Sequence, residues 1–250
     1  MNMKSMSAYG RAHILALVSG IVYLEPAAAS EQAEELGFTA FEYYDNGGAQ
    51  AYRFENDTDV VFACRGTEPG NWNDMIADAR LFKVRSDTEG GVHKGFKVEV
   101  DDIWDPVYKD LQSLKDSEKS IWFTGHSLGG AMSTIMASRA WADDSLGEPI
   151  ELHTFGSPRP GNRRFRDSVA DEKHYRWRHN NDIVTRVPPA FLGYRHTGQE
   201  HYLNGKGDLV INGGFWYKFK DQIKGLFANR FDSIADHAIA TYAKHIKGLM

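Results

Sequence analysis

The stretch IWFTGHSLGGAMS, residues 121–133, decides the fold. A short apolar run ends at Gly125, Ser127 follows two residues later, and Gly129 and Gly130 open a run of small residues. This pattern predicts a strand that turns sharply into a helix, with the serine at the turn. A residue at such a turn has a strained backbone, and glycines two positions before and after it remove the Cβ atoms that would collide.

The turn gives Ser127 a chemical role. It lifts the Oγ atom clear of the chain and directs backbone N–H groups of the following helix start toward the reacting atom. The alternative is a purely structural turn. The strand before Ser127 and the small-residue helix after it favour a nucleophile.

A serine nucleophile needs a base, and the base needs an acid to orient it. In this type of fold both follow the serine, with the acid first. Asp182 stands directly after the strand His174–His179, in the segment HYRWRHNNDIVTRVPP. The acid is the favoured role for Asp182, and an Asx turn is the alternative.

The base is expected among the histidines that follow Asp182. His237 lies at a loop-to-helix boundary in FDSIADHAIATYAKHI, from which its side chain can reach back to the sheet edge. His245, two turns into that helix, fits a solvated position. His196 and His201 lie on an expected hairpin and remain candidates.

The rest of the chain alternates strands and helices. Alternating aromatic residues broken at glycine and asparagine turns predict an antiparallel three-stranded meander before Cys64. We then expect an α/β fold with a mostly parallel sheet covered by helices. The expected elements are a helix over 95–114 kinked at Pro106, strands 121–124, 151–155 and 174–179, helices 129–141 and 163–169, a hairpin over 194–203 and 209–211, and helices 217–227 and 234–246. No linker or repeat divides residues 1–250, so we expect one domain.

Composition excludes several classes of function. The chain has 250 residues and a net charge of −5, which disfavours binding to nucleic acid. Its densest basic run, RPGNRRFR at 159–166, fits a solvated loop and helix start. One cysteine, Cys64, excludes an intrachain disulfide. No metal-ligand spacing or phosphate-binding glycine loop is present in the sequence, so we expect neither a metal nor a cofactor.

The first thirty residues allow two interpretations. The apolar stretch Ile14–Leu24 has helical spacing and favours a packed first helix. The same stretch, followed by Ala27-Ala28-Ala29, also fits a signal peptide that ends near Ala29. We therefore expect a cytoplasmic protein, with secretion as the alternative. The stretch is too short to span a bilayer, and we expect no transmembrane segment.

Several motifs in order resemble the class 3 lipases, the family of the filamentous-fungal lipases and many bacterial relatives. The resemblance extends from about Ala16 to the C-terminus. The motifs are FACRGTEPGNW (62–72), GVHKGF (91–96), TGHSLGGA (124–131), TFGSPRPGN (154–162), NNDIVTRVPP (180–189), YRHTGQEHYL (194–203) and DHAIATY (236–242). The likeness is closer to bacterial members because the disulfides of the secreted fungal enzymes are impossible here.

The resemblance implies an α/β-hydrolase fold and a serine esterase. It assigns Ser127 as nucleophile, Asp182 as acid and His237 as base. It also implies that Thr67 and the N–H of Leu128 hold the oxyanion. Cys64 departs from the phenylalanine that the family often has there, and we interpret it as a small buried strand residue instead of a reactive thiol.

The expected substrate is an acylglycerol or a similar lipid ester. Phospholipids and feruloyl-type esters are alternatives, and so is a catalytically silent scaffold that binds a lipid or protein. Residues 68–91 occupy the position of the fungal lid, and a lid that opens at a lipid–water interface is one hypothesis for them. The aromatic cluster at 213–227 fits an acyl pocket, a contact with a lipid interface or an ordinary core helix.

Overall fold

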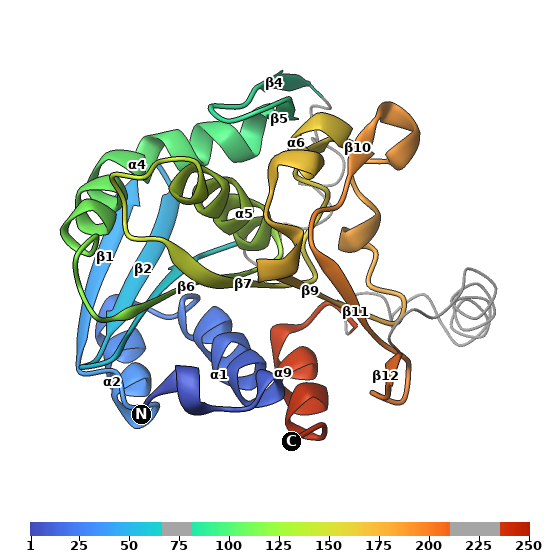
Figure 1. The fold of residues 1–250 in the computed structure, drawn as a ribbon. Helices are drawn as coiled ribbons and strands as arrows, with labels where there is room; N and C mark the ends of the chain where they lie inside the picture. Colours follow the sequence, from blue (N-terminus) through green and yellow to red (C-terminus); the bar gives the residue numbers. More distant parts are fainter. Residues whose placement is uncertain (67–81, 211–235) are drawn as a thin grey trace.

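The computed structural model describes residues 1–66, 82–210 and 236–250, and a large twisted sheet organises them (Figure 1). Eight strands follow the spatial order β1-β2-β3-β6-β7-β9-β11-β12. Their bounds are Ala40–Asn46 (β1), Ala49–Glu55 (β2), Asp59–Cys64 (β3), Ser120–His126 (β6), Pro149–Phe155 (β7), His174–His179 (β9), Gln199–Leu203 (β11) and Leu209–Val210 (β12).

The centre of the sheet is parallel and its ends are antiparallel. β3, β6, β7, β9 and β11 pair in parallel, whereas β1, β2 and β3 form the expected antiparallel meander. Parallel strands end at the same edge, so the residues that follow His126, Phe155 and His179 meet there. This edge is where α/β sheets carry their functional groups.

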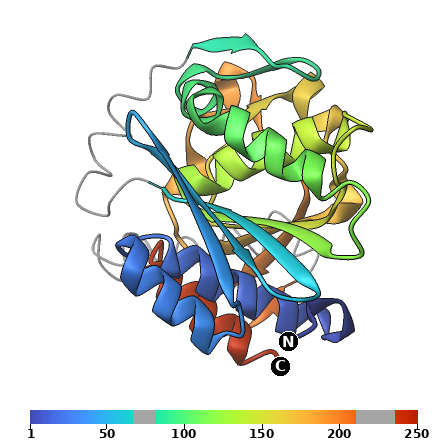
Figure 2. The same cartoon turned by 90° about the vertical axis from the view of Figure 1, so that its left-hand side faces the viewer.

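Helices cover both faces of the sheet (Figure 2). One face carries α1 (Ala8–Ile21), α2 (Pro26–Glu35) and α9 (Ile239–Lys247), and the other carries α4 (Lys94–Ser113) and α5 (Leu128–Trp141). Each layer has its own apolar core, one around Leu15, Trp122 and Tyr242, the other around Phe62 and Ile103. The shorter helices are Met3–Ser5 (η1), Arg163–Ser168 (α6), Asp171–Lys173 (η3), Val184–Arg186 (η4) and Ala190–Leu192 (η5).

The N-terminal residues form the expected packed helix. Leu15, Ala16 and Val18 of α1 are fully buried. The hydroxyl of Ser19 lies 2.9 Å from that of Thr124 on the central strand β6. The alanines at 27–29 lie in α2, which also packs on the sheet.

Helix α4 is continuous through Pro106, contrary to the expected kink or split. Proline removes the N–H that would bond to the carbonyl of Asp102 four residues earlier. The side-chain amide of Asn46 donates to that carbonyl instead, at 2.8 Å. An acceptor satisfied from outside the helix, together with the exposure of Pro106, allows α4 to continue.

The hairpin expected over 194–203 and 209–211 forms only in part, because residues 199–203 pair with 209–210 whereas 194–195 lie in another sheet. Tyr194–Arg195 (β10) pairs with Gly161–Asn162 (β8) in a second, antiparallel sheet of order β10-β8-β5-β4, with Gly91–His93 (β5) and Lys83–Arg85 (β4). β11 instead joins the large sheet beside β9 and makes its hairpin with β12. Gly198, at φ +74°, lies between the two strands where the chain leaves one sheet for the other.

Several expectations lie wholly or partly outside the described residues. They concern Thr67, most of the lid hypothesis at 68–91, the cluster at 213–227 and the helix at 217–227. Within the lid region the structure describes β4, which is held in the second sheet. Among the helices that the structure describes, none combines the length and the apolar character that crossing a bilayer requires.

Candidate active site

The turn at Ser127 has the geometry that its sequence predicts. Ser127 sits between β6 and α5 with φ 62° and ψ −132°, a conformation that costs on the order of 1–3 kcal/mol for a non-glycine residue. A Cβ on Gly125 would lie 2.3 Å from the Gly129 carbonyl oxygen, and one on Gly129 would lie 2.2 Å from the Cys64 carbonyl oxygen. Only glycine fits at either position.

The backbone of Ser127 is anchored and its hydroxyl is not. Its N–H donates to the carbonyl of Phe155 at the end of β7, at 2.9 Å. Its side chain is fully buried, and Oγ has no hydrogen-bond partner among the residues that the structure describes. A buried hydroxyl without a partner is costly, so its retention in a strained turn points to chemistry.

Asp182 lies three residues past β9 at the same sheet edge and is fully buried. Its Oδ1 accepts the N–H of Val184 at 2.9 Å, which is the Asx turn considered as an alternative. Its two oxygens also lie 2.9 and 2.8 Å from Nδ1 of His237. Asp182 therefore makes the Asx turn and contacts His237 at the same time, and the turn fixes the carboxylate in place.

His237 precedes α9 and is buried. A carboxylate only accepts hydrogen bonds, so the imidazole Nδ1–H donates to Asp182. The proton on Nδ1 leaves Nε2 as the basic nitrogen of the ring. This is the orientation that a general base needs.

Gly156 brings the acid and the base together. It follows β7 with φ +59°, and a Cβ there would lie 2.6 Å from Oδ2 of Asp182 and 2.9 Å from Nδ1 of His237. Glycine therefore leaves the space that the Asp182–His237 pair occupies. Sequence reasoning missed this residue, although it belongs to the TFGSPRPGN motif.

His126 supports His237 from the side. Its Nε2–H donates to the backbone carbonyl of His237 at 2.6 Å, and its Nδ1 accepts the hydroxyl of Tyr23 at 3.0 Å. Burial and the nearby His237 hold the pKa of His126 well below its usual value. The rings of His126 and His237 have centroids 4.4 Å apart, and a neutral His126 places no positive charge beside His237.

The other candidate histidines do not meet Asp182 within the described part of the chain. His196 has Nε2 2.8 Å from the carbonyl of Thr185, and His201 packs against Trp177 with ring centroids 4.8 Å apart. His245 has its ring 4.9 Å from that of His179. Among His196, His201, His237 and His245, it is His237 that contacts Asp182 in the described part of the chain.

Leu128 lies at the helix start after the turn, and Cys64 is a buried strand residue, as the sequence predicts. Leu128 is the first residue of α5, so its N–H belongs to the free N-terminal turn of that helix. Cys64 is fully buried at the end of β3, and burial raises the pKa of its thiol to about 12. A thiol of this kind is inert at neutral pH.

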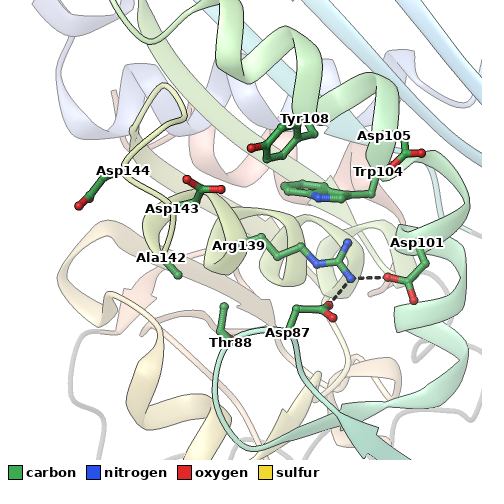
Figure 3. A pocket seen from close by; sticks show the side chains of 10 residues that line it. All are labelled: Asp87, Thr88, Asp101, Trp104, Asp105, Tyr108, Arg139, Ala142, Asp143 and Asp144. Atoms are coloured by element: carbon green, nitrogen blue, oxygen red, sulfur yellow. Dashed lines mark hydrogen bonds and ion pairs between the residues drawn. The ribbon is translucent and has the colours of Figure 1, made fainter.

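A cavity of about 650 Å³ lies away from this site, between α4 and the C-terminal end of α5 (Figure 3). Arg139 donates to Asp87 and Asp101 there and lies over the ring of Trp104, 4.9 Å from its centroid. At 1.5 Å per helical residue, Arg139 stands roughly 18 Å along α5 from Ser127. The cavity is therefore no part of the Ser127 site.

Comparison with known proteins identifies the family of this chain. The family model described as "Lipase (class 3)" matches residues 61–192, more than half of the chain. The chain belongs to the class 3 lipase family. The matched class 3 segment holds Ser127 and Asp182, and His237 follows it.

Two curated relatives of this class 3 chain are fungal. A secreted mono- and diacylglycerol lipase 1 of Fusarium solani is 39% identical over 119 residues, which span 46% of this chain but only 35% of the relative. A secreted mono- and diacylglycerol lipase LIP2 of Malassezia restricta is 27% identical over 210 residues, 74% of this chain and 67% of the relative. The triacylglyceride lipase of Rhizomucor miehei has a similar structure, with a TM-score of 0.68, 22% identity and 90% of each chain covered, which establishes the α/β-hydrolase fold.

Proposed function

We propose that this class 3 family member is a carboxylic ester hydrolase that acts on acylglycerols through Ser127, His237 and Asp182. The observation that carries the proposal is the buried Asp182–His237 pair, with 2.8 Å between Oδ2 and Nδ1, at the sheet edge that also presents the strained Ser127. The family match supports ester hydrolysis, and the two relatives named as mono- and diacylglycerol lipases support an acylglycerol substrate.

The reaction begins with proton transfer. Nε2 of His237 takes the hydroxyl proton of Ser127 while Oγ bonds to the ester carbonyl carbon, and the carbonyl electron pair moves onto oxygen. Asp182 stabilises the imidazolium that forms. The N–H of Leu128 and the N–H and hydroxyl of Thr67 donate to the new oxyanion.

Collapse of the tetrahedral intermediate breaks the bond to the alcohol, which leaves with the proton from His237. Water then enters, gives a proton to His237 and attacks the acyl carbon. The second collapse returns that proton to Ser127 Oγ and releases the carboxylic acid. His237 therefore acts in turn as base and as acid in both halves of the reaction.

The test is hydrolysis of monoacyl-, diacyl- and triacylglycerols of increasing chain length, with and without an emulsion surface. Phosphatidylcholine and a feruloyl ester serve as competing substrates. Ser127→Ala is expected to lower kcat on the order of 10⁴–10⁶-fold. Ser145→Ala, at an exposed serine, is the matched control and should keep wild-type activity.

The outcomes separate the alternatives. Preference for acylglycerols supports the proposal, and faster turnover at the emulsion surface supports action at a lipid–water interface. Preference for phosphatidylcholine or the feruloyl ester would show that the same triad acts on another class of ester. A folded wild type that hydrolyses none of these esters contradicts an esterase and favours the silent scaffold.

Helix α1 bears on the compartment in which the protein works, because a signal peptide that ends near Ala29 would include it. Both relatives are named as secreted, which supports the secreted alternative over the cytoplasmic one. Cleavage near Ala29 would remove Leu15 and Val18 from the core. We therefore propose that the active enzyme retains α1 wherever it works, and the intact mass of the purified active protein tests this.

A further inference from the structure

A cluster of arginines lies on the sheet face above β9 and β11, outside the Ser127–His237–Asp182 triad. Arg176 and Arg178 alternate along β9 and point to the same face. Both approach one carboxylate oxygen, Oε1 of Glu200 on β11, at 3.3 and 3.7 Å. A single shared carboxylate compensates one of these two charges.

Two other parts of the chain bring further positive charge close to β9. The loop after β7 carries Arg159, and residues 183–195 carry Arg186 and Arg195. Arg159 donates from Nη1 to the carbonyls of Arg186 and, at 2.9 Å, Pro188, and Arg195 donates to the carbonyl of Ala190 at 2.7 Å. Among the described residues, no carboxylate forms an ion pair with Arg159, Arg186 or Arg195. The guanidinium groups of Arg159 and Arg195 are held by neutral carbonyls, so no described carboxylate is bonded to either charge.

The arginines lie close enough together to affect the pKa of Arg159. Burial, and then the charges of Arg176, Arg178, Arg195 and Arg186, lower the pKa of Arg159 to about 10. Burial and the same positive surroundings also hold the pKa of His196 well below its usual value. Asp182 acts on Arg186, but that carboxylate is already bound by His237 and Tyr242.

Two of the three guanidinium nitrogens of Arg176 lack an acceptor among the described residues. Arg176 is 8% exposed, and its Nε and Nη1 are buried without a hydrogen-bond partner in the described part of the chain. Nε of Arg178 is buried and unpartnered in the same way. Guanidinium remains charged when buried, and leaving its N–H groups unsatisfied is more costly than for a neutral donor.

We propose that this arginine cluster, formed by residues 159, 176, 178, 186 and 195, binds a small soluble oxyanion of the phosphate class. A tetrahedral oxyanion offers several acceptor oxygens and matches the forked geometry of guanidinium groups. Arg186, at the outer end of the cluster, is exposed, whereas Arg176, at its base, is buried. A free anion reaches such a base more readily than a headgroup held in a lipid surface.

The inference is independent of ester hydrolysis. A bound oxyanion would join Arg176 on β9 to Arg186 and Arg195. Both lie in residues 183–195, the segment that begins just after Asp182. Occupancy is therefore expected to stabilise the folded protein, because a ligand that binds only the native state raises the unfolding temperature by mass action.

The experiment measures the thermal midpoint of the full chain against inorganic phosphate, with chloride at equal ionic strength, together with calorimetric titration of phosphate. Wild type should show a saturable rise in Tm of several degrees and measurable binding heat. Arg176→Gln should lose both. Its Tm without phosphate should stay at the wild-type value or exceed it, because one of several buried like charges is gone.

Controls separate specific binding from general salt effects. Phosphate strengthens burial in any protein, and this effect should remain in every variant. Arg163→Gln is the matched control, since Arg163 has a 79% exposed side chain and pairs with Asp167 on its own helix. It should respond like wild type. If Arg176→Gln does not fold, Arg178→Gln provides the same test.

Two results would overturn the proposal. One is an equal Tm response to phosphate in wild type and in the folded Arg176 or Arg178 variant, without binding heat in wild type. The other is an arginine-dependent association with vesicles of phosphatidic acid, absent from phosphatidylcholine vesicles, in a protein that binds no free phosphate. That second result would assign the cluster to a lipid headgroup.

Discussion

The hydroxyl of Tyr242 donates a 2.6 Å hydrogen bond to Oδ2 of Asp182. The same hydroxyl accepts the backbone N–H of His179 at 3.0 Å, so β9 orients it. Burial and the adjacent Asp182 raise the pKa of Tyr242 well above its usual value, which keeps it a donor at any working pH. Tyr242 on α9 thus fixes the carboxylate that holds His237.

Tyr242→Phe should therefore slow the reaction without affecting substrate binding. A hydrogen bond to a charged group contributes on the order of 1.5–3 kcal/mol, so we expect kcat to fall about ten- to a hundredfold with KM unchanged. Steady-state kinetics on a soluble short-chain ester measures both constants. Tyr194→Phe is the matched control, because the buried Tyr194 hydroxyl has no partner among the described residues. A comparable loss of kcat in both variants would contradict a specific role for Tyr242.

Gly156→Ala should separate Asp182 from His237. Its Cβ would lie 2.6 Å from the Asp182 carboxylate and 2.9 Å from the His237 ring, so one of them must move. Displacement of a catalytic base by about 1 Å costs on the order of a hundredfold in rate. We expect kcat/KM to fall at least that far.

Gly47→Ala controls for backbone strain in that comparison. Gly47 has φ +63°, close to the +59° of Gly156, but the atom nearest to a Cβ at this position would be 4.0 Å away. Both variants should lose stability from the positive φ, as measured by thermal unfolding, and Gly156→Ala should lose more because of its close contacts. Only Gly156→Ala should lose activity, and an active Gly156→Ala would refute the packing argument.

The sequence predicts the elements whose local pattern agrees with their tertiary role. The turn at Ser127 is one, because its glycines are required by contacts within the turn itself and with Cys64. The helix face from Phe96 to Leu111 is another, because a 3.6-residue apolar period is sufficient to define it. Asp182 is recognisable because it lies three residues after a strand.

The features that the sequence does not predict depend on contacts between residues that are distant in the chain. The continuity of α4 through Pro106 depends on Asn46, sixty residues earlier. Tyr194 joins a strand near Gly161 because the chain changes sheets at Gly198, and no local pattern encodes that choice. Tyr242 resembles any core aromatic residue until the fold places it against Asp182.

Asp59→Ala should destabilise the protein through its N-terminal segment. The buried Asp59 carboxylate accepts the N–H of Met3 at 3.0 Å and the indole N–H of Trp122 at 2.8 Å. Its loss leaves both donors unsatisfied, at a cost on the order of 2–4 kcal/mol. Tm should fall by roughly 5–12 °C. Asp57→Ala, at an exposed position in the same turn, should change Tm little. Equal Tm values for the two variants would contradict this assignment.

Glu99→Gln should stabilise the protein at alkaline pH. Burial, and then the nearby Asp102, raise the pKa of Glu99 to about 7. In the unfolded chain the same carboxyl ionises near its ordinary value of about 4.3. The folded state therefore binds the extra proton between these two pKa values, so stability falls as pH rises through this window and levels off above it.

Glutamine removes that titration. The variant should match wild type near pH 4 and exceed it at pH 8 by an amount on the order of 1–3 kcal/mol. Urea unfolding at a series of pH values measures the difference. Glu118→Gln changes an exposed glutamate, so its free energy of unfolding should follow the same pH dependence as that of wild type. If the Glu99→Gln advantage is constant with pH, the stabilisation comes from a changed contact, and Glu99 does not titrate in this range.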